Sequence, residues 1–350
     1  MSCYHPNIII LQENGIIKKD GTKGYKTSFI PWTSKQYEHY INWNKKNSEL
    51  TYQYENNQKT KFILAPCGMC QGCKTDRRKE WAIRLEKESK YYKHNYFLTL
   101  TYDDSNIIIP KYWAMSDTGE VIYNTGTWRG TLSKYHCERF IRSLKEHFRT
   151  KYNHTGMKYY IVGEYASRPH YHAILLNCPE IPLEVIGKNK QGQTYYTNEK
   201  IAKIWNKGFI TIGNVTWDSI SYVAGYVNKK RFGKKAIHDH DILGRIPEFA
   251  HMSNGIGRKY YEENREKIYE NDEIINAKGQ SLKPPGYYDR LLEKDDPELL
   301  RAIKQKREKI SAYETDKKIK TISSPLRDQL KNEEVIAEDK QTIYNRSRIK

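Results

Sequence analysis

Two neighbouring runs of β-forming residues predict a β-hairpin. The first run covers residues 157–165 and the second covers residues 170–176, and only the turn Ala166-Ser167-Arg168-Pro169 separates them. So short a connection can join antiparallel strands, whereas parallel strands need a crossover of about a dozen residues or more. The chain is therefore expected to contain an antiparallel sheet, around which the other elements pack.

The elements on either side of this hairpin follow the order β-α-β-β-α-β-α over residues 96–230. An antiparallel sheet with helices packed on it is typical of the α+β class. We expect about five strands in the sheet, and we expect Ser133 to be the N-cap of a helix. The further predicted elements are strands at 96–102 and 208–213 and helices at 75–92, 134–149, 201–205 and 216–230.

Three segments are expected along the chain. Residues 1–92 form an N-terminal segment with a cysteine cluster and a basic helix, and its first part shows little regular periodicity. Residues 93–232 form the α+β core. Residues 233–350 form a C-terminal extension that ends in a strongly charged stretch with few aromatic residues, so we expect a helical or partly disordered tail there.

The charge balance favours a polyanionic partner. The chain has 60 Lys and Arg residues against 42 Asp and Glu residues, a formal net charge of +18. Basic contacts to phosphates release condensed counterions, which makes nucleic acid a natural partner for such a chain. The 29 tyrosines would offer stacking platforms for unpaired bases. The alternative is a basic soluble protein without such a partner.

Targeting and membrane signals are absent from the sequence. No apolar run approaches the ~20 residues of a membrane span, and the N-terminus lacks the regions of a signal peptide. We therefore expect no membrane association and a reducing, cytoplasmic compartment. There the six cysteines are expected to be metal ligands or free thiols rather than disulfides.

The hairpin carries residues that could hold a metal ion. His170 and His172 are two apart on a predicted strand, so their side chains point to the same face. If the hairpin centres on Ser167, Glu164 lies opposite His170 on that face. Two imidazoles and a carboxylate would suit Mg²⁺, Mn²⁺ or another divalent ion with open positions for a phosphate oxygen. The alternative is a pair of structural histidines.

A tyrosine pair on the last predicted helix is the candidate nucleophile. Tyr222 and Tyr226 are four apart, so they project from one face one turn apart, and Lys229 and Lys230 continue that face. A phenol has a pKa of about 10 and needs a nearby cation to attack at neutral pH. Gly225 costs a helix interior about 1 kcal/mol, which would make sense if DNA or the sheet approaches closely. The alternative is a helix whose tyrosines simply pack on the sheet.

The cysteine cluster has the spacing of a metal site. Cys67, Cys70 and Cys73 form C-x₂-C-x₂-C, and Cys3 is a possible fourth ligand. Four thiolates would make a closed structural zinc site that ties the N-terminus to the basic helix. An iron–sulfur cluster and plain free thiols are the alternatives.

Taken together, these elements resemble the HUH endonucleases, the single-strand nickases of rolling-circle replication. The order and the spacing of three motifs carry the resemblance. The motifs are Phe97-Leu98-Thr99-Leu100-Thr101, Pro169-His170-Tyr171-His172 and Tyr222-Val223-Ala224-Gly225-Tyr226-Val227-Asn228-Lys229-Lys230.

The sequence is still more similar to the replication initiators of microviruses, especially of the gokushovirus type. This similarity covers about residues 1–260. It is carried by Pro66-Cys67-Gly68-Met69-Cys70-Gln71-Gly72-Cys73, Trp81-Ala82-Ile83-Arg84, Phe97-Leu98-Thr99-Leu100-Thr101-Tyr102-Asp103-Asp104 and Gly163-Glu164-Tyr165.

The resemblance implies a metal-dependent nickase that works in the host bacterial cytoplasm, with residues 93–232 as its endonuclease core. His170 and His172 would bind the ion and Glu164 would complete its shell. Tyr222 or Tyr226 would cut single-stranded DNA at the replication origin and keep a 5′-phosphotyrosine link, and a host polymerase, with a host helicase, would extend the free 3′-OH. The other tyrosine would cut the regenerated origin, so that a circle is released.

Two other functions fit some of these features. One is a non-catalytic, zinc-containing nucleic-acid-binding protein. The other is a metal-dependent hydrolase of another phosphate substrate, in which the tyrosines are structural. A covalent protein–DNA adduct separates the three functions, since only the nickase forms one.

Overall fold

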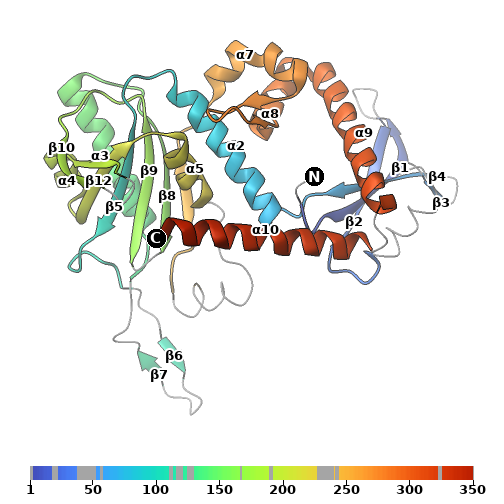
Figure 1. The fold of residues 1–350 in the computed structure, drawn as a ribbon, viewed down its shortest axis with the longest axis horizontal. Helices are drawn as coiled ribbons and strands as arrows, with labels where there is room; N and C mark the ends of the chain where they lie inside the picture. The colour runs from blue at the N-terminus through green and yellow to red at the C-terminus, as the bar shows by residue number, and fades with distance from the viewer. Residues whose placement is uncertain are drawn as a thin grey trace. The chain divides into compact units, whose positions relative to one another are not determined.

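The chain forms two compact units, which are described separately (Figure 1). The first comprises Met1–Arg77 and Leu292–Lys350, and the second comprises Arg78–Leu291. The structure, a computed structural model, describes residues 3–17, 23–37, 53–55, 58–109, 113–115, 121–123, 130–165, 168–188, 192–226, 240, 244–321 and 325–349.

A seven-stranded sheet forms the centre of the second unit, and every strand pair in it is antiparallel. The predicted α+β class is confirmed, with seven strands rather than about five. The strand order is β10-β11-β12-β5-β9-β8-β13. The strands are β5 (Tyr96–Tyr102), β8 (Lys158–Tyr165), β9 (Pro169–Leu176), β10 (Glu184–Lys188), β11 (Thr194–Thr197), β12 (Gly208–Asn214) and β13 (Phe249–Met252).

Strand alternation divides this sheet between two hydrophobic cores. Tyr171, Ala173 and Leu175 of β9 belong to a core that includes residues of α3 (Lys134–Tyr152) and α4 (Glu199–Trp205). Ile174 and Leu176 point the other way, into a core with α2 (Gln71–Ser89) and α5 (Trp217–Tyr226). Because strand side chains alternate, His170 and His172 lie on the α2/α5 face.

Helix α3 begins and is packed as its sequence predicts. The Ser133 side chain accepts a hydrogen bond from the backbone N–H of His136 at 3.2 Å, which satisfies one free donor at the helix start. Phe140, Leu144 and Phe148 are buried on one face. The helix ends where Asn153 adopts a left-handed conformation, with φ of 48°.

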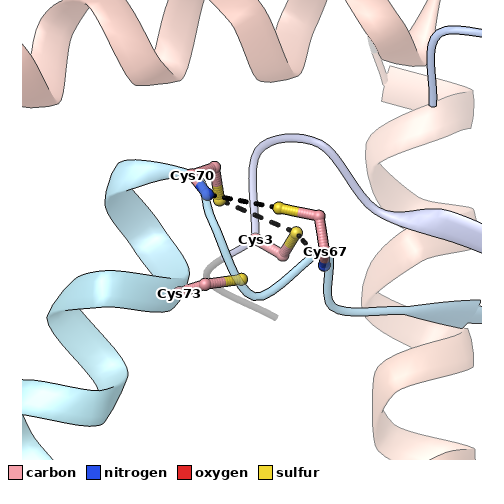
Figure 2. A group of neighbouring side chains, drawn as sticks. All are labelled: Cys3, Cys67, Cys70 and Cys73. Atoms are coloured by element: carbon pink, nitrogen blue, oxygen red, sulfur yellow. Dashed lines mark hydrogen bonds between the residues drawn. The ribbon is translucent and has the colours of Figure 1, made fainter. Parts of the chain in front are cut away.

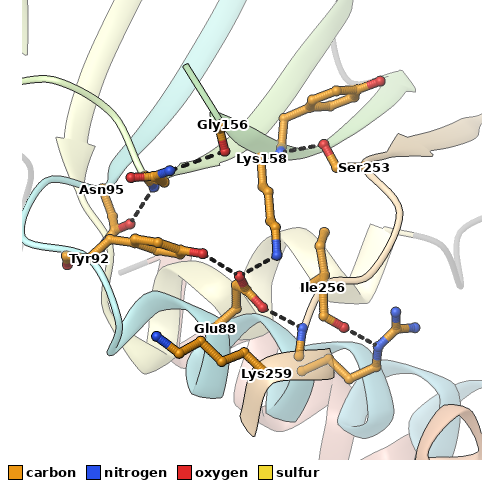
Figure 3. A network of polar contacts seen from close by, with 12 residues as sticks. Glu88, Tyr92, Asn95, Gly156, Lys158, Ser253, Ile256 and Lys259 are labelled. Atoms are coloured by element: carbon orange, nitrogen blue, oxygen red, sulfur yellow. Dashed lines mark hydrogen bonds and ion pairs between the residues drawn. The ribbon is translucent and has the colours of Figure 1, made fainter. Parts of the chain in front are cut away.

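Helix α2 starts at Gln71, before its predicted start near residue 75, and ends at Ser89. Its last turn carries Glu88, which is completely buried. The carboxylate accepts hydrogen bonds from Lys158 Nζ at 2.6 Å, from the Tyr92 hydroxyl at 2.8 Å and from the backbone N–H of Gly257 at 2.6 Å (Figure 3). Gly257 precedes α7 (Arg258–Asn271), so one carboxylate holds α2, β8 and the start of α7 together.

The remaining described elements of the second unit are small. They are the two-stranded pairs β6 (Trp113–Met115) with β7 (Val121–Tyr123) and β14 (Ile274–Ile275) with β15 (Ser281–Leu282), and α8 (Gly286–Asp295), which runs into the first unit.

The first unit contains a second antiparallel sheet, of order β2-β1-β4-β3. Our expectation of an N-terminal stretch with little regular structure is therefore wrong. The described apolar side chains of the sheet pack with Leu326 and Leu330, which lie some 300 residues away in the sequence, so local periodicity gives a weak signal. The elements are β1 (Asn7–Ile17), β2 (Lys23–Ile30), β3 (Gln53–Glu55), β4 (Gln58–Ala65), α9 (Pro297–Thr321) and α10 (Leu326–Ile349).

Two helices, α9 and α10, make up the charged C-terminal tail, for which a helical or partly disordered state was expected. Across the described residues, none of the helices combines the length and the apolar character that crossing a bilayer requires.

Candidate active site

Two adjacent strands position three potential metal ligands on the face covered by α5. The register pairs Glu164 of β8 with His170 of β9, as the hairpin geometry predicts, and pairs Val162 with His172. Glu164 Oε1 lies 2.6 Å from Nε2 of His170 and 3.2 Å from Nε2 of His172. Glu164 and His172 are buried, and His170 is half-buried. The sheet thus directs two imidazoles at a single carboxylate oxygen.

Hydrogen bonds behind the imidazoles fix which nitrogen faces the carboxylate. His170 Nδ1 lies 3.0 Å from the carbonyl oxygen of Arg168, which can only accept, so Nδ1 carries a hydrogen. In a neutral imidazole Nε2 then has a lone pair, and this lone pair faces the Glu164 carboxylate. His172 Nδ1 contacts the Thr99 hydroxyl at 3.0 Å. Such outer hydrogen bonds are typical of metal-binding histidines, because they set the ring orientation.

A cation fits the point where these three groups converge. Two lone pairs at 2.6 Å repel each other, so the Glu164–His170 contact requires a positive charge, from a proton or from a metal ion. The donor atoms of Glu164, His170 and His172 all lie within 4.8 Å of one another. One carboxylate oxygen and two imidazole nitrogens suit Mn²⁺ or a similar divalent ion.

Both candidate nucleophiles contact the second histidine. The ring of Tyr226 stacks on His172 with centroids 5.2 Å apart and an interplanar angle of 17°. The ring of Tyr222 meets His172 edge-on at 5.1 Å and meets Tyr226 at 4.7 Å. The expected spacing of one helical turn therefore brings both phenols to the His/His/Glu cluster.

The two tyrosines differ in their access to solvent. Tyr222 is 39% exposed, whereas Tyr226 is 4% exposed. Burial raises the pKa of the Tyr226 phenol well above its usual range, and the negative charge of Glu164 and the neighbouring Tyr222 raise it further. A phenol in this position stays protonated at neutral pH unless a cation approaches it.

Three contacts at the site were not anticipated from the sequence. Thr99 of β5 is paired with His172 in the strand register, and Phe97 stacks on the same imidazole at 5.7 Å. Both belong to a motif that the sequence singled out without a role, and their half-buried positions alternate with buried ones along β5. The position of Gly225 is approached by Arg78 of α2, 3.5 Å from where a Cβ would lie, and not by the sheet as one reading of that glycine suggested.

Lys229 and Lys230, expected to continue the tyrosine face, lie outside the described residues. The four cysteines predicted as a cluster do lie together, in the first unit (Figure 2). The sulfurs of Cys3, Cys67, Cys70 and Cys73 are within 4.8 Å of one another and form no disulfide.

Known proteins similar to this chain are phage replication-associated proteins. The family model for replication-associated protein ORF2 matches residues 95–231. The chain is 36% identical over 255 residues to replication-associated protein ORF2 of Spiroplasma virus 4, a match that covers 70% of this chain and 73% of that protein. It is 30% identical over 240 residues to replication-associated protein VP4 of Bdellovibrio phage phiMH2K, covering 67% and 69%.

A third relative is replication-associated protein ORF4 of Chlamydia phage 1, at 27% identity over 172 residues, 47% of this chain and 38% of that protein. No solved structure matches the chain. The resemblance inferred from the ordered motifs is confirmed by these relatives. The chain belongs to the family of phage replication-associated proteins, of the microvirus type.

Proposed function

We propose that this protein is a metal-dependent endonuclease and strand transferase that nicks single-stranded DNA at a replication origin and starts rolling-circle replication of a small phage genome. The observation that carries the proposal is the contact of both Tyr222 and Tyr226 with His172, at 5.1 and 5.2 Å between ring centroids. A nucleophile pair and a potential metal site thus share one position. The family membership supports a role in replication.

The metal in this proposal is Mg²⁺ or Mn²⁺, held by Glu164 Oε1 and by Nε2 of His170 and of His172. When bound, such an ion neutralises a non-bridging oxygen of the scissile phosphate and polarises the phosphorus. The Thr99 hydroxyl and the Arg168 carbonyl hold the two imidazoles in the orientation that this requires.

The tyrosines carry the covalent step. The hydroxyl oxygen of one of them attacks the phosphorus, and the bond from phosphorus to the 3′-oxygen of the preceding nucleotide breaks. The phenolic proton is lost and the 3′-oxygen leaves as a hydroxyl, so one phosphodiester is exchanged for another. DNA remains joined to the protein through a 5′-phosphotyrosine. We propose Lys229 and Lys230 as the cations that balance charge on the phosphate or on a phenolate.

Two nucleophiles one helical turn apart allow two sequential cuts at one site. While Tyr222 or Tyr226 holds the 5′ end, a host polymerase extends the 3′-OH, aided by a host helicase, in the host cytoplasm. The other tyrosine then cuts the regenerated origin. The new 3′-OH attacks the first phosphotyrosine, which releases a closed circle and restores the first phenol. Residues 93–232 are the proposed endonuclease core.

The test is a search for a covalent adduct. The full chain is incubated with Mn²⁺ and tiled single-stranded fragments of the phage genome that encodes it, and then denatured. We expect a protein–DNA adduct with one fragment, and its loss in His172→Ala and in the Tyr222→Phe/Tyr226→Phe double variant. Tyr135→Phe is the matched control, because Tyr135 is an exposed helical tyrosine on α3.

Each alternative function predicts a different outcome. Binding without cleavage would indicate a non-catalytic nucleic-acid-binding protein, and cleavage without linkage would indicate a hydrolase. An adduct that persists in the double variant would refute the assignment of Tyr222 and Tyr226 as nucleophiles.

A further inference from the structure

The strand register of the first unit brings the N-terminus to the segment that precedes α2. Asn7 of β1 is paired with Ala65 of β4. Cys3 lies shortly before Asn7, and Cys67 lies shortly after Ala65. Because the two strands are antiparallel, the incoming chain and the outgoing chain meet at the same edge of the sheet. Cys3 and Cys67 are adjacent for this reason, although 64 residues separate them.

The start of α2 brings the other two cysteines to the same place. Cys70 immediately precedes the helix, and Cys73 is its third residue. Positions three apart at a helix start lie on one side of the helix. The sulfurs of Cys3 and Cys70 are 3.7 Å apart. A tetrahedron of sulfurs at the usual Zn–S distance of about 2.3 Å has edges of about 3.8 Å. The separation is far too long for a disulfide, which needs about 2.05 Å.

Backbone N–H groups point at three of the sulfurs. Cys3 Sγ accepts from the N–H of Cys67 at 3.3 Å, and Cys70 Sγ accepts from the N–H of Tyr4 at 3.3 Å. Cys67 Sγ accepts from the N–H groups of Met69 and Cys70, at 3.4 and 3.2 Å. A neutral thiol is a weak acceptor. This concentration of donors fits sulfurs that carry negative charge.

The surroundings also offset the negative charge that four thiolates would leave around a divalent ion. The cluster lies at the N-terminus of α2, where the helix dipole is positive. Arg77 donates from Nη2 to the carbonyl oxygen of Gly68, within the Cys67–Cys70 loop, at 3.3 Å, which adds a guanidinium beside the loop. A thiolate cluster is thus favoured here by both fixed dipoles and a cation.

We propose that Cys3, Cys67, Cys70 and Cys73 bind one zinc ion in a closed, structural site, separate from the His/His/Glu cluster. Four sulfur ligands fill a tetrahedral shell and leave no position for water or substrate, so the ion has no part in the cleavage chemistry. Its role is to fasten the N-terminal segment and the β1–β4 edge to the first turn of α2. The inference does not depend on the nuclease function.

The test measures metal rather than activity. The full chain is purified without added metal, and its zinc is measured by mass spectrometry after dialysis. We expect about one tightly bound zinc per chain, lost in Cys73→Ser and in Cys3→Ser. The ion should be retained in His172→Ala and in Cys178→Ser, whose cysteine is buried outside the cluster. Retention in the two cluster variants would overturn the assignment.

Cobalt substitution keeps the test valid if a cluster variant fails to fold. Wild-type protein refolded with Co²⁺ should develop intense sulfur-to-cobalt charge-transfer absorption and the visible bands of a tetrahedral tetrathiolate site. Absence of these bands, or purification of the wild type with iron and inorganic sulfide in place of zinc, would refute the proposal. A spectrum of tetrahedral cobalt with fewer than four sulfurs would also refute it, because the site would then be open.

Discussion

Removal of the Glu88 carboxylate should destabilise the second unit strongly. Glu88 is fully buried and accepts from Lys158 Nζ, the Tyr92 hydroxyl and the Gly257 N–H, at 2.6 to 2.8 Å. In Glu88→Ala, Tyr92 and Gly257 each lose an acceptor, at about 1–3 kcal/mol for a donor left unpaired in the interior. Lys158 adds less, because its side chain is 27% exposed and water can reach the ammonium. The sum is about 3–5 kcal/mol, the range for breaking one side of a buried ion pair.

The assay is urea unfolding of the full chain, followed by hydrogen exchange of peptides from β8 and the start of α7. These peptides report on the second unit alone, so unfolding of the first unit does not distort the result. Glu146→Ala is the matched control, since Glu146 also forms a carboxylate ion pair, with Arg149, but on an exposed helix face. That control should leave unfolding unchanged. A loss below about 1 kcal/mol in Glu88→Ala would mean that the carboxylate is not the junction of these elements.

Three further predictions concern the site itself. Thr99→Val removes the hydroxyl behind His172 and should lower adduct yield and Mn²⁺ affinity by about 10–100-fold; unchanged Mn²⁺ affinity in calorimetry would exclude Thr99 as a positioning residue. Because Tyr222 is 39% exposed and Tyr226 is 4% exposed, Tyr222→Phe should reduce initial adduct formation more than Tyr226→Phe, and peptide mapping should find the first DNA link on Tyr222. Equal yields from both single variants would show that exposure does not set the order. Gly225→Ala should stabilise α5 by about 0.5–1 kcal/mol, because the new methyl group meets Arg78 Cδ at 3.5 Å, an ordinary contact; a loss of stability in thermal unfolding would indicate that Arg78 cannot yield.

The metal cluster could be predicted from the sequence because it is local. Glu164, His170 and His172 lie within one hairpin, and alternation with a short turn determines both the register and the face. The spacing of Tyr222 and Tyr226 follows in the same way from helical periodicity. In each case a few residues of one element contain all the information that the geometry needs.

The neighbours of these residues were decided by tertiary packing. The sequence does not say that α5 lies across β9, so that both phenols reach His172, nor that β5 pairs with β9 and puts Thr99 behind that imidazole. The second sheet was missed for the same reason, since its described apolar residues pack against α10.

Periodicity tells which face of an element is buried, whereas the identity of its partner depends on contacts between distant segments. Those contacts form only if burial across the whole unit outweighs the entropy of closing long loops. The sequence alone therefore determined the ligands on the hairpin and the spacing of the tyrosines. Only the folded chain decided that the two sets meet, because α2, α5 and β9 share one hydrophobic core.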